Sequence, residues 1–266
     1  MKKHPVMKRI LPLLLLFTPL FSFGQFTAIP DTNFEQALID QGHDTGTPDG
    51  QVLTANISGL SHLNLSNNSI SDLTGIEDFT ALSYLQCFHN QLTSLDVTQN
   101  TALIELHCGF NQLTSLVTQN TALTLLDCQS NQLTSLDVTQ NTILAGFACA
   151  NNQLNCLNLK NGNNALLSYF FSTGNSALTC IEVDDVAWST SNWTVAGGNI
   201  DSGVTFSTNC TNACSTATVG IEEYSNQPKK LIRIIDYLGR ETTFKPNTPL
   251  IYQYDNGSVE KVMEVW

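Results

Sequence analysis

Basic side chains are almost absent from the central part of this sequence. Residues 26–228 contain 18 Asp and Glu but a single basic residue, Lys160, which gives this part a net charge of −17. Proteins that bind nucleic acid need Lys and Arg to displace counterions from the phosphate backbone. The composition therefore argues against nucleic acid as a partner.

Long apolar runs are also missing after residue 23. Residues 1–9 carry four basic side chains, and the apolar run that follows extends from Ile10 to Phe23 and is closed by Gly24. A basic head, a short apolar stretch and a small-residue exit predict a secretory signal peptide over residues 1–24. The run is too short for a transmembrane helix. We therefore expect no transmembrane anchor in the mature chain.

Motifs of known catalytic chemistry are absent as well. The sequence contains no GxSxG, HExxH or Walker motif. His107 and Cys108 are neighbours, but side chains alternate along a strand, so the two cannot act as a dyad. Glu105 would share a face with His107, as unrelated pairs do on any sheet. We predict that the chain is not an enzyme and that it uses no cofactor or metal.

The middle third of the chain contains a clear repeat. Asn-Gln-Leu recurs four times, and each copy closes the pattern LxxLxCxxNxL, as in residues 82–92, with Phe147 in place of the second Leu in the last copy. A less regular unit precedes these copies and another follows them. The repeat asparagines are Asn68, Asn90, Asn111, Asn131, Asn152 and Asn175. This pattern is typical of a leucine-rich repeat, in which each unit adds one short parallel strand to a solenoid.

The predicted fold is a mainly β leucine-rich repeat solenoid with a parallel sheet on its concave face. We expect an N-terminal cap with a short helix over 25–56, about six repeats of 20–23 residues over 57–178, a C-terminal cap over 179–214, a linker over 215–228 and a small antiparallel β module over 229–266. The second half of each repeat, such as 92–100, is rich in Thr, Asp and Asn, which disfavour helix. We interpret it as a convex turn or a second short strand.

The N-terminal cap has local helix signals. Thr32 and Glu35 have the spacing of a capping box. Gly42 is placed to end the helix. Residues 44–50 resemble a calcium loop only faintly, because they lack the alternating ligands and terminal Glu of an EF-hand. We interpret this segment as an acidic turn.

Two columns of identical side chains are expected inside the solenoid. The repeat asparagines would hydrogen-bond the backbone of adjacent turns. One cysteine per repeat stands where related patterns have an inward Leu: Cys87, Cys108, Cys128 and Cys149. Strands stack about 4.8 Å apart, which puts the first and fourth thiols about 14 Å apart. This separation excludes a shared zinc ion, with bonds of about 2.3 Å, and favours packing as small hydrophobes.

The other four cysteines are disulfide candidates in an exported chain. They are Cys156, Cys180, Cys210 and Cys214. Four cysteines allow three complete pairings. We favour a bond between Cys180 and Cys210, which would close the C-terminal cap, and the partner of Cys156 stays open.

Strand alternation predicts the side chains that face outward from the concave sheet. Aromatic, imidazole and carboxylate groups collect on the early and final repeats, with small residues between them. The candidate ligand contacts are Tyr84, Phe88, His107, Asp127, Tyr169 and Phe171. Exposed aromatic rings beside polar groups favour ligand contact. The alternative is a solvated sheet with scattered aromatics.

The C-terminal segment resembles a type A sorting domain of the type IX secretion system. The resemblance is carried by KKLIRIIDYLGRET (229–242), by KPNTPLIYQYDNGSVEK (245–261) and by their place at the end of the sequence. It implies Sec export followed by type IX secretion, with that machinery as a partner. It also implies removal of the tail and a final location in the medium or on the outer-membrane surface. Residues 27 to about 210 resemble secreted bacterial leucine-rich repeat proteins, which implies protein binding or adhesion.

Two functions stay open at this point. In the first, a secreted or cell-surface protein binds a protein or polysaccharide through its concave face and mediates adhesion. In the second, the chain is a structural surface-layer or spacer component without a specific ligand. Saturable binding that is lost on mutation of the concave aromatics would favour the first function. Self-association that is insensitive to them would favour the second.

Overall fold

A computed structural model describes residues 25–117, 119–211, 214, 231–235, 241–243, 250–254 and 259–262. The chain divides into two compact units, with the boundary between Cys214 and Ser215. The predicted signal peptide and the predicted linker lie outside the described residues.

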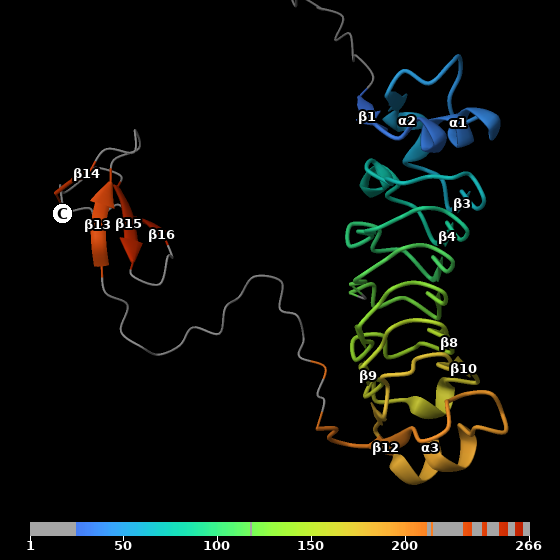
Figure 1. Cartoon of the computed structure of the whole chain (residues 1–266). Helices are drawn as coiled ribbons and strands as arrows, with labels where there is room; N and C mark the ends of the chain where they lie inside the picture. Colours follow the sequence, from blue (N-terminus) through green and yellow to red (C-terminus); the bar gives the residue numbers. More distant parts are fainter. Residues whose placement is uncertain are drawn as a thin grey trace, which may run out of the picture. The chain divides into compact units, whose positions relative to one another are not determined.

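The first unit begins with a small cap (Figure 1). Its elements are β1 (Phe26–Ala28), α1 (Thr32–Asp40), β2 (Gln51–Leu53) and α2 (Thr54–Ile57). β1 and β2 pair antiparallel. α1 buries Phe34 and Leu38 completely, and the ring of Phe34 stacks on Phe79 at 6.1 Å. The cap therefore covers the open end of the repeat core.

The capping box predicted from Thr32 and Glu35 is wrong. The residue that caps α1 is Asp31, whose carboxylate accepts hydrogen bonds from the backbone N–H groups of Asn33 and Phe34. A carboxylate one residue earlier reaches these free N–H groups directly, as N-cap residues do, so Thr32 is already the first helical residue.

The end of α1 follows the prediction. Gly42 has a φ of 78°, in the left-handed region. Its N–H bonds to the carbonyl of Ile39, and the N–H of His43 bonds to that of Leu38. This pair of reversed bonds is a Schellman motif, which satisfies the last carbonyls of the helix.

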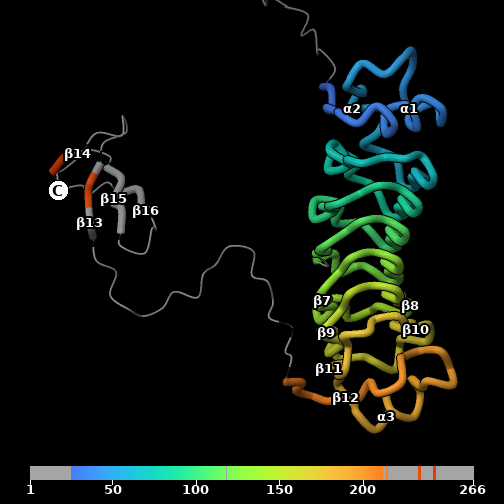
Figure 2. The backbone as a smooth tube through the Cα atoms, viewed as in Figure 1, coloured from blue at the N-terminus to red at the C-terminus, as the bar shows by residue number. Residues whose placement is uncertain are grey.

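Six strands form the concave sheet, one for each repeat. In spatial order they are β3 (His62–Asn64), β4 (Tyr84–Gln86), β5 (Glu105–His107), β6 (Leu125–Asp127), β8 (Gly146–Ala148) and β10 (Tyr169–Phe171). All are parallel and keep one register, which places Tyr84 opposite Glu105 and Glu105 opposite Leu125. Figure 2 shows the successive coils stacked one on another. The leucine-rich repeat solenoid predicted from the sequence is confirmed.

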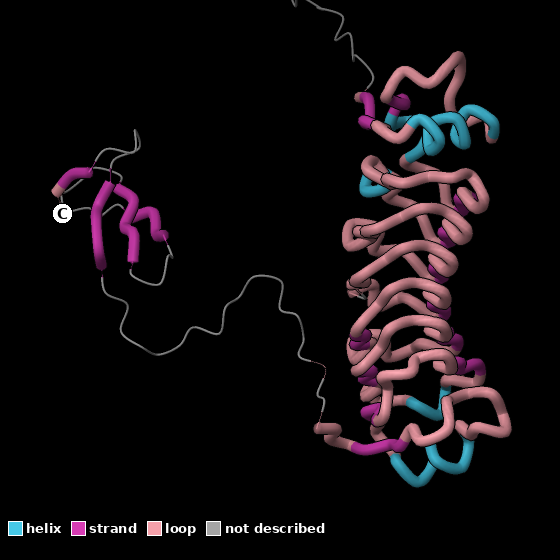
Figure 3. The backbone as a smooth tube through the Cα atoms, in the orientation of Figure 1, coloured by secondary structure: helices cyan, strands magenta, loops and turns pink. Residues whose placement is uncertain are grey.

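A second parallel sheet occupies the other side of the last coils. It contains β7 (Ser135–Asp137), β9 (Cys156–Asn158), β11 (Cys180–Glu182) and β12 (Thr205–Ser207). In Figure 3 these strands lie across the coil from β8 and β10, whereas the matching segment of the earlier coils is drawn as loop. Both interpretations of the second half-repeat therefore occur, a turn early and a strand late. Two short 3₁₀ helices, η1 (Ile76–Asp78) and η2 (Asn164–Leu166), lie in connecting segments.

The C-terminal cap closes the other end of the core. Helix α3 (Val186–Asn192) begins at Asp185, whose carboxylate accepts the N–H of Trp188. Trp193 is buried, with its ring 4.6 Å from that of Phe170 and 5.8 Å from that of Phe206. Aromatic packing of this kind replaces the missing next repeat.

The second unit is a small antiparallel sheet, as predicted. Its strands β13 (Leu231–Ile235), β14 (Glu241–Thr242), β15 (Leu250–Tyr254) and β16 (Val259–Val262) lie in the order β14-β13-β15-β16. Residues 255–258, between β15 and β16, lie outside the described residues. Among the residues that are described, no helix is long and apolar enough to span a membrane.

Candidate ligand-binding surface on the concave sheet

The repeat asparagines hold the spacing of the concave strands. Asn111 is representative: its side-chain oxygen accepts the N–H of Leu92 at 3.0 Å, and its amide donates to the carbonyls of Cys87 and Cys108 at 2.9 and 3.1 Å. Asn90, Asn131, Asn152 and Asn175 make the same bridge. In the first repeat, the side-chain amide of Asn68 donates to the nearby carbonyl of Ser66, and its backbone N–H donates to Asn90 Oδ1. The ladder fixes the backbone from which the outward side chains project.

The repeat cysteines line the inner side of the same strands. All four are fully buried and have free thiols. Burial raises the pKa of Cys87 to about 12 and raises the pKa values of Cys108, Cys128 and Cys149 well above that of an ordinary thiol. Thiols in this state are inert, because the thiolate is the reactive form. Among the described residues, no group of three or more His, Cys, Asp or Glu side chains is placed to hold a metal ion.

Outward side chains of the concave sheet form two rows across the strands. One row contains His62, Tyr84, Glu105, Leu125, Gly146 and Tyr169, and the other contains Asn64, Gln86, His107, Asp127, Ala148 and Phe171. Five of the six predicted contacts lie in these rows, and Phe88 follows β4 at the end of its strand. The structure divides the six into two groups, one on β4, β5 and β6 and one on β10.

The first group is ordered by contacts between neighbouring strands. The ring of His62 stacks on Tyr84 with centroids 4.3 Å apart and planes 6° apart. Glu105 Oε2 lies 3.5 Å from His107 Nε2, and both side chains are partly exposed. These contacts hold polar and aromatic groups in fixed positions that a ligand can reach.

A second aromatic cluster lies in the loops that follow β4 and β5. It contains Phe88, predicted as a contact, together with His89 and Phe110, which the sequence reasoning missed. The rings of His89 and Phe110 stack at 4.2 Å, and Phe88 meets His89 edge to face at 5.5 Å. Phe110 is 42% exposed. Their signal was present in the repeat alignment, since both occupy the position just before the repeat asparagine.

That position has a left-handed backbone throughout the solenoid. It is held by Asn67, His89, Phe110, Ser130 and Asn151, with φ between 53° and 61°, and by Gly174 with φ of 77°. The N–H of each non-glycine residue bonds to the carbonyl of the next repeat, as His89 bonds to Gly109 at 3.1 Å. The turn is thus a constant of the fold, and only its side chain varies.

Small residues separate the two groups of predicted contacts. Gly146, Ala148 and Ala150, on the repeat between the two groups, are buried, and so is Gly109, which follows β5 within the first group. A Cβ at Gly146 would lie 3.3 Å from the side chain of Leu125, and one at Gly109 would lie 3.2 Å from Asp127 Oδ1. The side chains of Leu125 and Asp127 therefore cover Gly146 and Gly109, respectively. The carboxylate of Asp127 is oriented beside Gly109 by the backbone and side-chain N–H groups of Gln129, both at 3.1 Å.

The last concave strand presents one open ring and one partly covered ring. Tyr169 is 51% exposed and meets Phe171 edge to face at 4.8 Å. Phe171 is half-buried, and its ring lies 4.0 Å from where a Cβ of Gly198 would be. Asn199 ties this cap loop to the strand, donating to the carbonyl of Phe170 at 2.9 Å. Phe171 therefore also supports the cap, and Tyr169 is the more accessible of the two.

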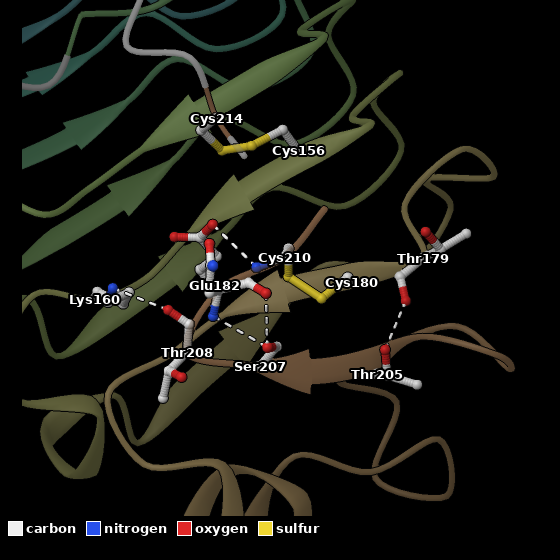
Figure 4. Close-up of a disulfide and its surroundings, with 11 residues drawn as sticks. Cys156, Lys160, Thr179, Cys180, Glu182, Thr205, Ser207, Thr208, Cys210 and Cys214 are labelled. Carbon is white, nitrogen blue, oxygen red and sulfur yellow. Dashed lines mark hydrogen bonds between the residues drawn. A yellow bond between two sulfur atoms is a disulfide. The ribbon is translucent and has the colours of Figure 1, made fainter. Parts of the chain in front are cut away.

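The C-terminal cysteines form two disulfides (Figure 4). Cys180 pairs with Cys210, as favoured from the sequence, and Cys156 pairs with Cys214, a partner that the sequence left open. The N–H of Cys210 also donates to the Glu182 carboxylate at 3.3 Å. The second bond returns the chain after the cap to strand β9, which begins at Cys156.

A shallow polar cavity of about 320 Å³ lies where the N-terminal cap meets the first repeats. It is lined by Ala37, Asp40, Gln41, Asn64, Ser66 and Asn68. Gln41 donates to the carbonyls of Ala37 and Asn64 at 2.8 and 2.9 Å, so much of this polar lining serves to join cap and repeat.

Comparison with known proteins points to internalins. No family model matches the chain. Over 74 residues it is 39% identical to internalin J of Listeria monocytogenes serotype 4b (strain F2365), which is 27% of this chain and 8% of that protein. The chain thus matches only a small part of that relative's length.

One solved structure supports the same similarity. The functional domain of InlJ from Listeria monocytogenes, described as including a cysteine ladder, matches with a TM-score of 0.51 and 32% identity over 60% of this chain and 38% of that one. An internalin (inlF) from strain 4b F2365 matches with a TM-score of 0.38 and 24% identity, over 57% of this chain and 42% of that one. The chain is a leucine-rich repeat solenoid with a buried cysteine column, similar to the InlJ domain.

Proposed function

We propose that this chain is a secreted or cell-surface protein that binds a protein or polysaccharide through its concave sheet and mediates adhesion. The observation that carries the proposal is the pair of ring stacks, His62 with Tyr84 and His89 with Phe110, held on neighbouring repeats beside Glu105 and Asp127. Binding hot spots are enriched in Trp, Tyr and Arg, and Tyr84 is a ring of this kind that is held in place by its neighbour. The similarity to internalins supports a binding role.

The rigidity of this surface also supports recognition. Its backbone is fixed by the parallel strands and by the asparagine ladder, so little conformational freedom remains to be lost on binding. Surfaces that are ordered in advance bind with a smaller entropic cost. A solenoid offers such a surface without needing a deep cleft.

The proposal includes no enzymatic step. In the described part of the chain, the four repeat thiols are buried and the remaining four cysteines are in disulfides. Glu105 and His107 form a contact but have no nucleophile beside them in the two outward rows. Noncovalent binding is the function that these groups support.

The test of binding is an array of extracellular proteins and polysaccharides probed with the purified chain. We expect a saturable ligand whose binding is lost in the variant Tyr84→Ala, Phe88→Ala, His107→Ala. Ile143→Ala is a matched control, because Ile143 is exposed in the segment before β8 and outside both outward rows. No ligand above background, with self-association unaffected by the triple variant, would favour the structural or spacer role instead.

We further propose that the second unit directs export through the type IX secretion system. Its support is the resemblance of residues 229–242 and 245–261 to type A sorting domains and their folding as a unit separate from the solenoid. Truncation after Pro228 should leave the protein in the periplasm, measured by fractionation and immunoblotting. Normal surface delivery of the truncated chain would contradict this route but would leave the binding proposal intact.

A further inference from the structure

We infer that Phe88, His89, Phe110, Glu105 and Asp127 form a docking surface for a basic protein segment that presents an arginine side chain. We call these five residues the aromatic–acidic ridge. The inference rests on the proposed binding function and names the chemistry of the partner. The guanidinium would stack on the exposed ring of Phe110 and pair with the carboxylate of Asp127.

The ring of Phe110 is not needed for the fold. Phe110 has a φ of 55°, a conformation that disfavours bulky residues, and it also exposes 42% of its surface. Other repeats place Asn, Ser or Gly at the same position, and Ser130 does so in the very next repeat. Phe110 therefore combines an unfavourable backbone conformation with an exposed apolar ring, at a position where the solenoid tolerates a small polar residue. Such a ring is explained by what it presents to solvent.

The rings in the described part of the chain are arranged so that one face of Phe110 has an aromatic neighbour and the other does not. His89 covers one face of Phe110, with planes 19° apart. The matching position of the next repeat is Ser130, and among the described residues no other ring contacts Phe110. One face of the phenyl ring is therefore left without an aromatic neighbour. A planar guanidinium stacks on such a face more readily than an ammonium ion does.

The surroundings of the rings are acidic. Residues 26–228 have one basic side chain, Lys160, and its amine donates to the carbonyl of Thr208 in the C-terminal cap, at 3.0 Å. No Lys or Arg in the described part of the solenoid is therefore available to pair with Asp127 or Glu105. Glu105 contacts His107 and Asp127 accepts two N–H groups of Gln129, so these carboxylates have polar neighbours but no Lys or Arg beside them among the described residues, and a basic partner can supply that charge. The net charge of −17 also attracts basic molecules at long range.

Asp127 lies beside the aromatic cluster. Its Oδ1 lies 3.2 Å from where a side chain of Gly109 would begin, and Gly109 directly precedes Phe110. The absence of a side chain at Gly109 leaves the carboxylate open beside the aromatic cluster. An apolar ligand would bury this charge with only the N–H groups of Gln129 to compensate it, and burying an ionised carboxylate without a counter-charge is costly. An arginine satisfies the carboxylate and the ring together, with its planar donors and its delocalised charge.

The experiment measures binding of fluorescent hexa-arginine, hexa-lysine and hexa-glutamine to the purified full chain at about 0.15 M salt. We expect saturable binding of hexa-arginine, weaker binding of hexa-lysine and none of hexa-glutamine. Phe110→Ser and Asp127→Asn should each weaken hexa-arginine binding by about tenfold. Phe110→Ser introduces the residue that the next repeat already carries, so the fold should tolerate it.

Matched controls separate the ridge from general charge and from other aromatics. Asp44→Asn removes the same charge from the N-terminal cap, and Phe26→Ser removes a ring that is 57% exposed on β1, outside the concave sheet; both should leave hexa-arginine binding unchanged. His89→Asn is a second ridge variant, because Asn67 and Asn151 occupy its position in other repeats. It should weaken hexa-arginine binding because Phe110 loses its stacking support.

Three results would overturn the inference. They are equal weakening by Asp44→Asn and Asp127→Asn, unchanged binding in both Phe110→Ser and His89→Asn, and no saturable binding of hexa-arginine. Any of these would leave the proposed function standing if an array ligand is still lost in the Tyr84/Phe88/His107 variant. A chain that binds no extracellular protein or polysaccharide would contradict the proposed function itself, whatever the peptides do.

Discussion

The two ends of the solenoid perform the same task with different chemistry. At the N-terminal end, two carboxylates accept backbone hydrogen bonds. Glu35 is fully buried and accepts the N–H groups of Asp49 and Gly50 at 2.6 and 2.8 Å. Asp31 caps α1 and also accepts the N–H and hydroxyl of Ser71, each at 2.8 Å, which ties the helix to the first repeat.

The C-terminal end is held by covalent bonds. Cys180 and Cys210 are 30 positions apart in the sequence, and Cys156 and Cys214 are 58 positions apart. Together the two disulfides span the segment from β9 to Cys214. Disulfides respond to reductant, whereas the hydrogen bonds that Glu35 and Asp31 accept are removed by substitution of these residues. The comparison shows that one core can be closed by either means and that the two caps should fail under different conditions.

The largest effect is expected from removing the disulfides. Replacing all four bonded cysteines with alanine should lower the free energy of unfolding by about 3–4 kcal/mol for each bond, because the unfolded chain regains the entropy of two closed loops. Urea unfolding would measure the loss, and hydrogen exchange would locate it. Faster exchange confined to residues 156–210 is expected. Equal acceleration in α1 would contradict the independence of the two caps.

A smaller loss is expected from the N-terminal carboxylate. Glu35→Ala leaves the N–H groups of Asp49 and Gly50 without their buried acceptor and should cost about 3 kcal/mol. Urea unfolding with hydrogen exchange of residues 26–53 would test this. Asp44→Asn, which removes a charge from the same cap, is the control and should change stability little. A loss of equal size in the control would show that net charge matters rather than these two bonds.

A pH dependence should distinguish the ends further. Partial burial raises the pKa of Asp31, but hydrogen bonds from Ser71, Phe34 and Asp72 outweigh it, so the pKa lies below its usual value. The ionised carboxylate therefore stabilises the fold above about pH 4, and this contribution is lost as the pH falls through the lowered pKa. Asp31→Ala should cost about 1 kcal/mol at neutral pH.

Urea titrations at several pH values would measure that difference. The gap between the native protein and Asp31→Ala should be constant above about pH 5 and shrink below about pH 4. The gap caused by the disulfide variant should not change over the same range. A constant gap for Asp31→Ala down to the acid transition would contradict the assigned hydrogen bonds.

The smallest effect is expected at the repeat cysteines. Under reductant without denaturant, iodoacetamide should label Cys156, Cys180, Cys210 and Cys214 and leave the four repeat thiols unmodified, because burial keeps their pKa values high. Mass spectrometry of peptides would count the labels. Early labelling of Cys108 would mean that the middle of the solenoid opens as readily as its C-terminal end.

Local patterns account for what could be predicted of the surface. Strand alternation placed Tyr84 and Tyr169 outward and Cys87 inward, since neighbours along a strand face opposite sides wherever the strand pairs. His89 and Phe110 were missed because they stand after the strand, where alternation ends. Their left-handed backbone comes from a turn that the fold repeats, and their stacking joins two coils.

By itself the sequence determined the solenoid, its period and the inner and outer sides of each strand, because these depend on spacing between residues a few positions apart. Only the tertiary structure decided the burial of Glu35 over Asp49 and Gly50, the bond between Cys156 and Cys214, and the contact of the cap loop with Phe171. Each of these joins residues 14 to 58 positions apart or packs separate elements together. Such contacts depend on which distant segments the folded chain brings together, and the sequence of a single repeat does not determine this.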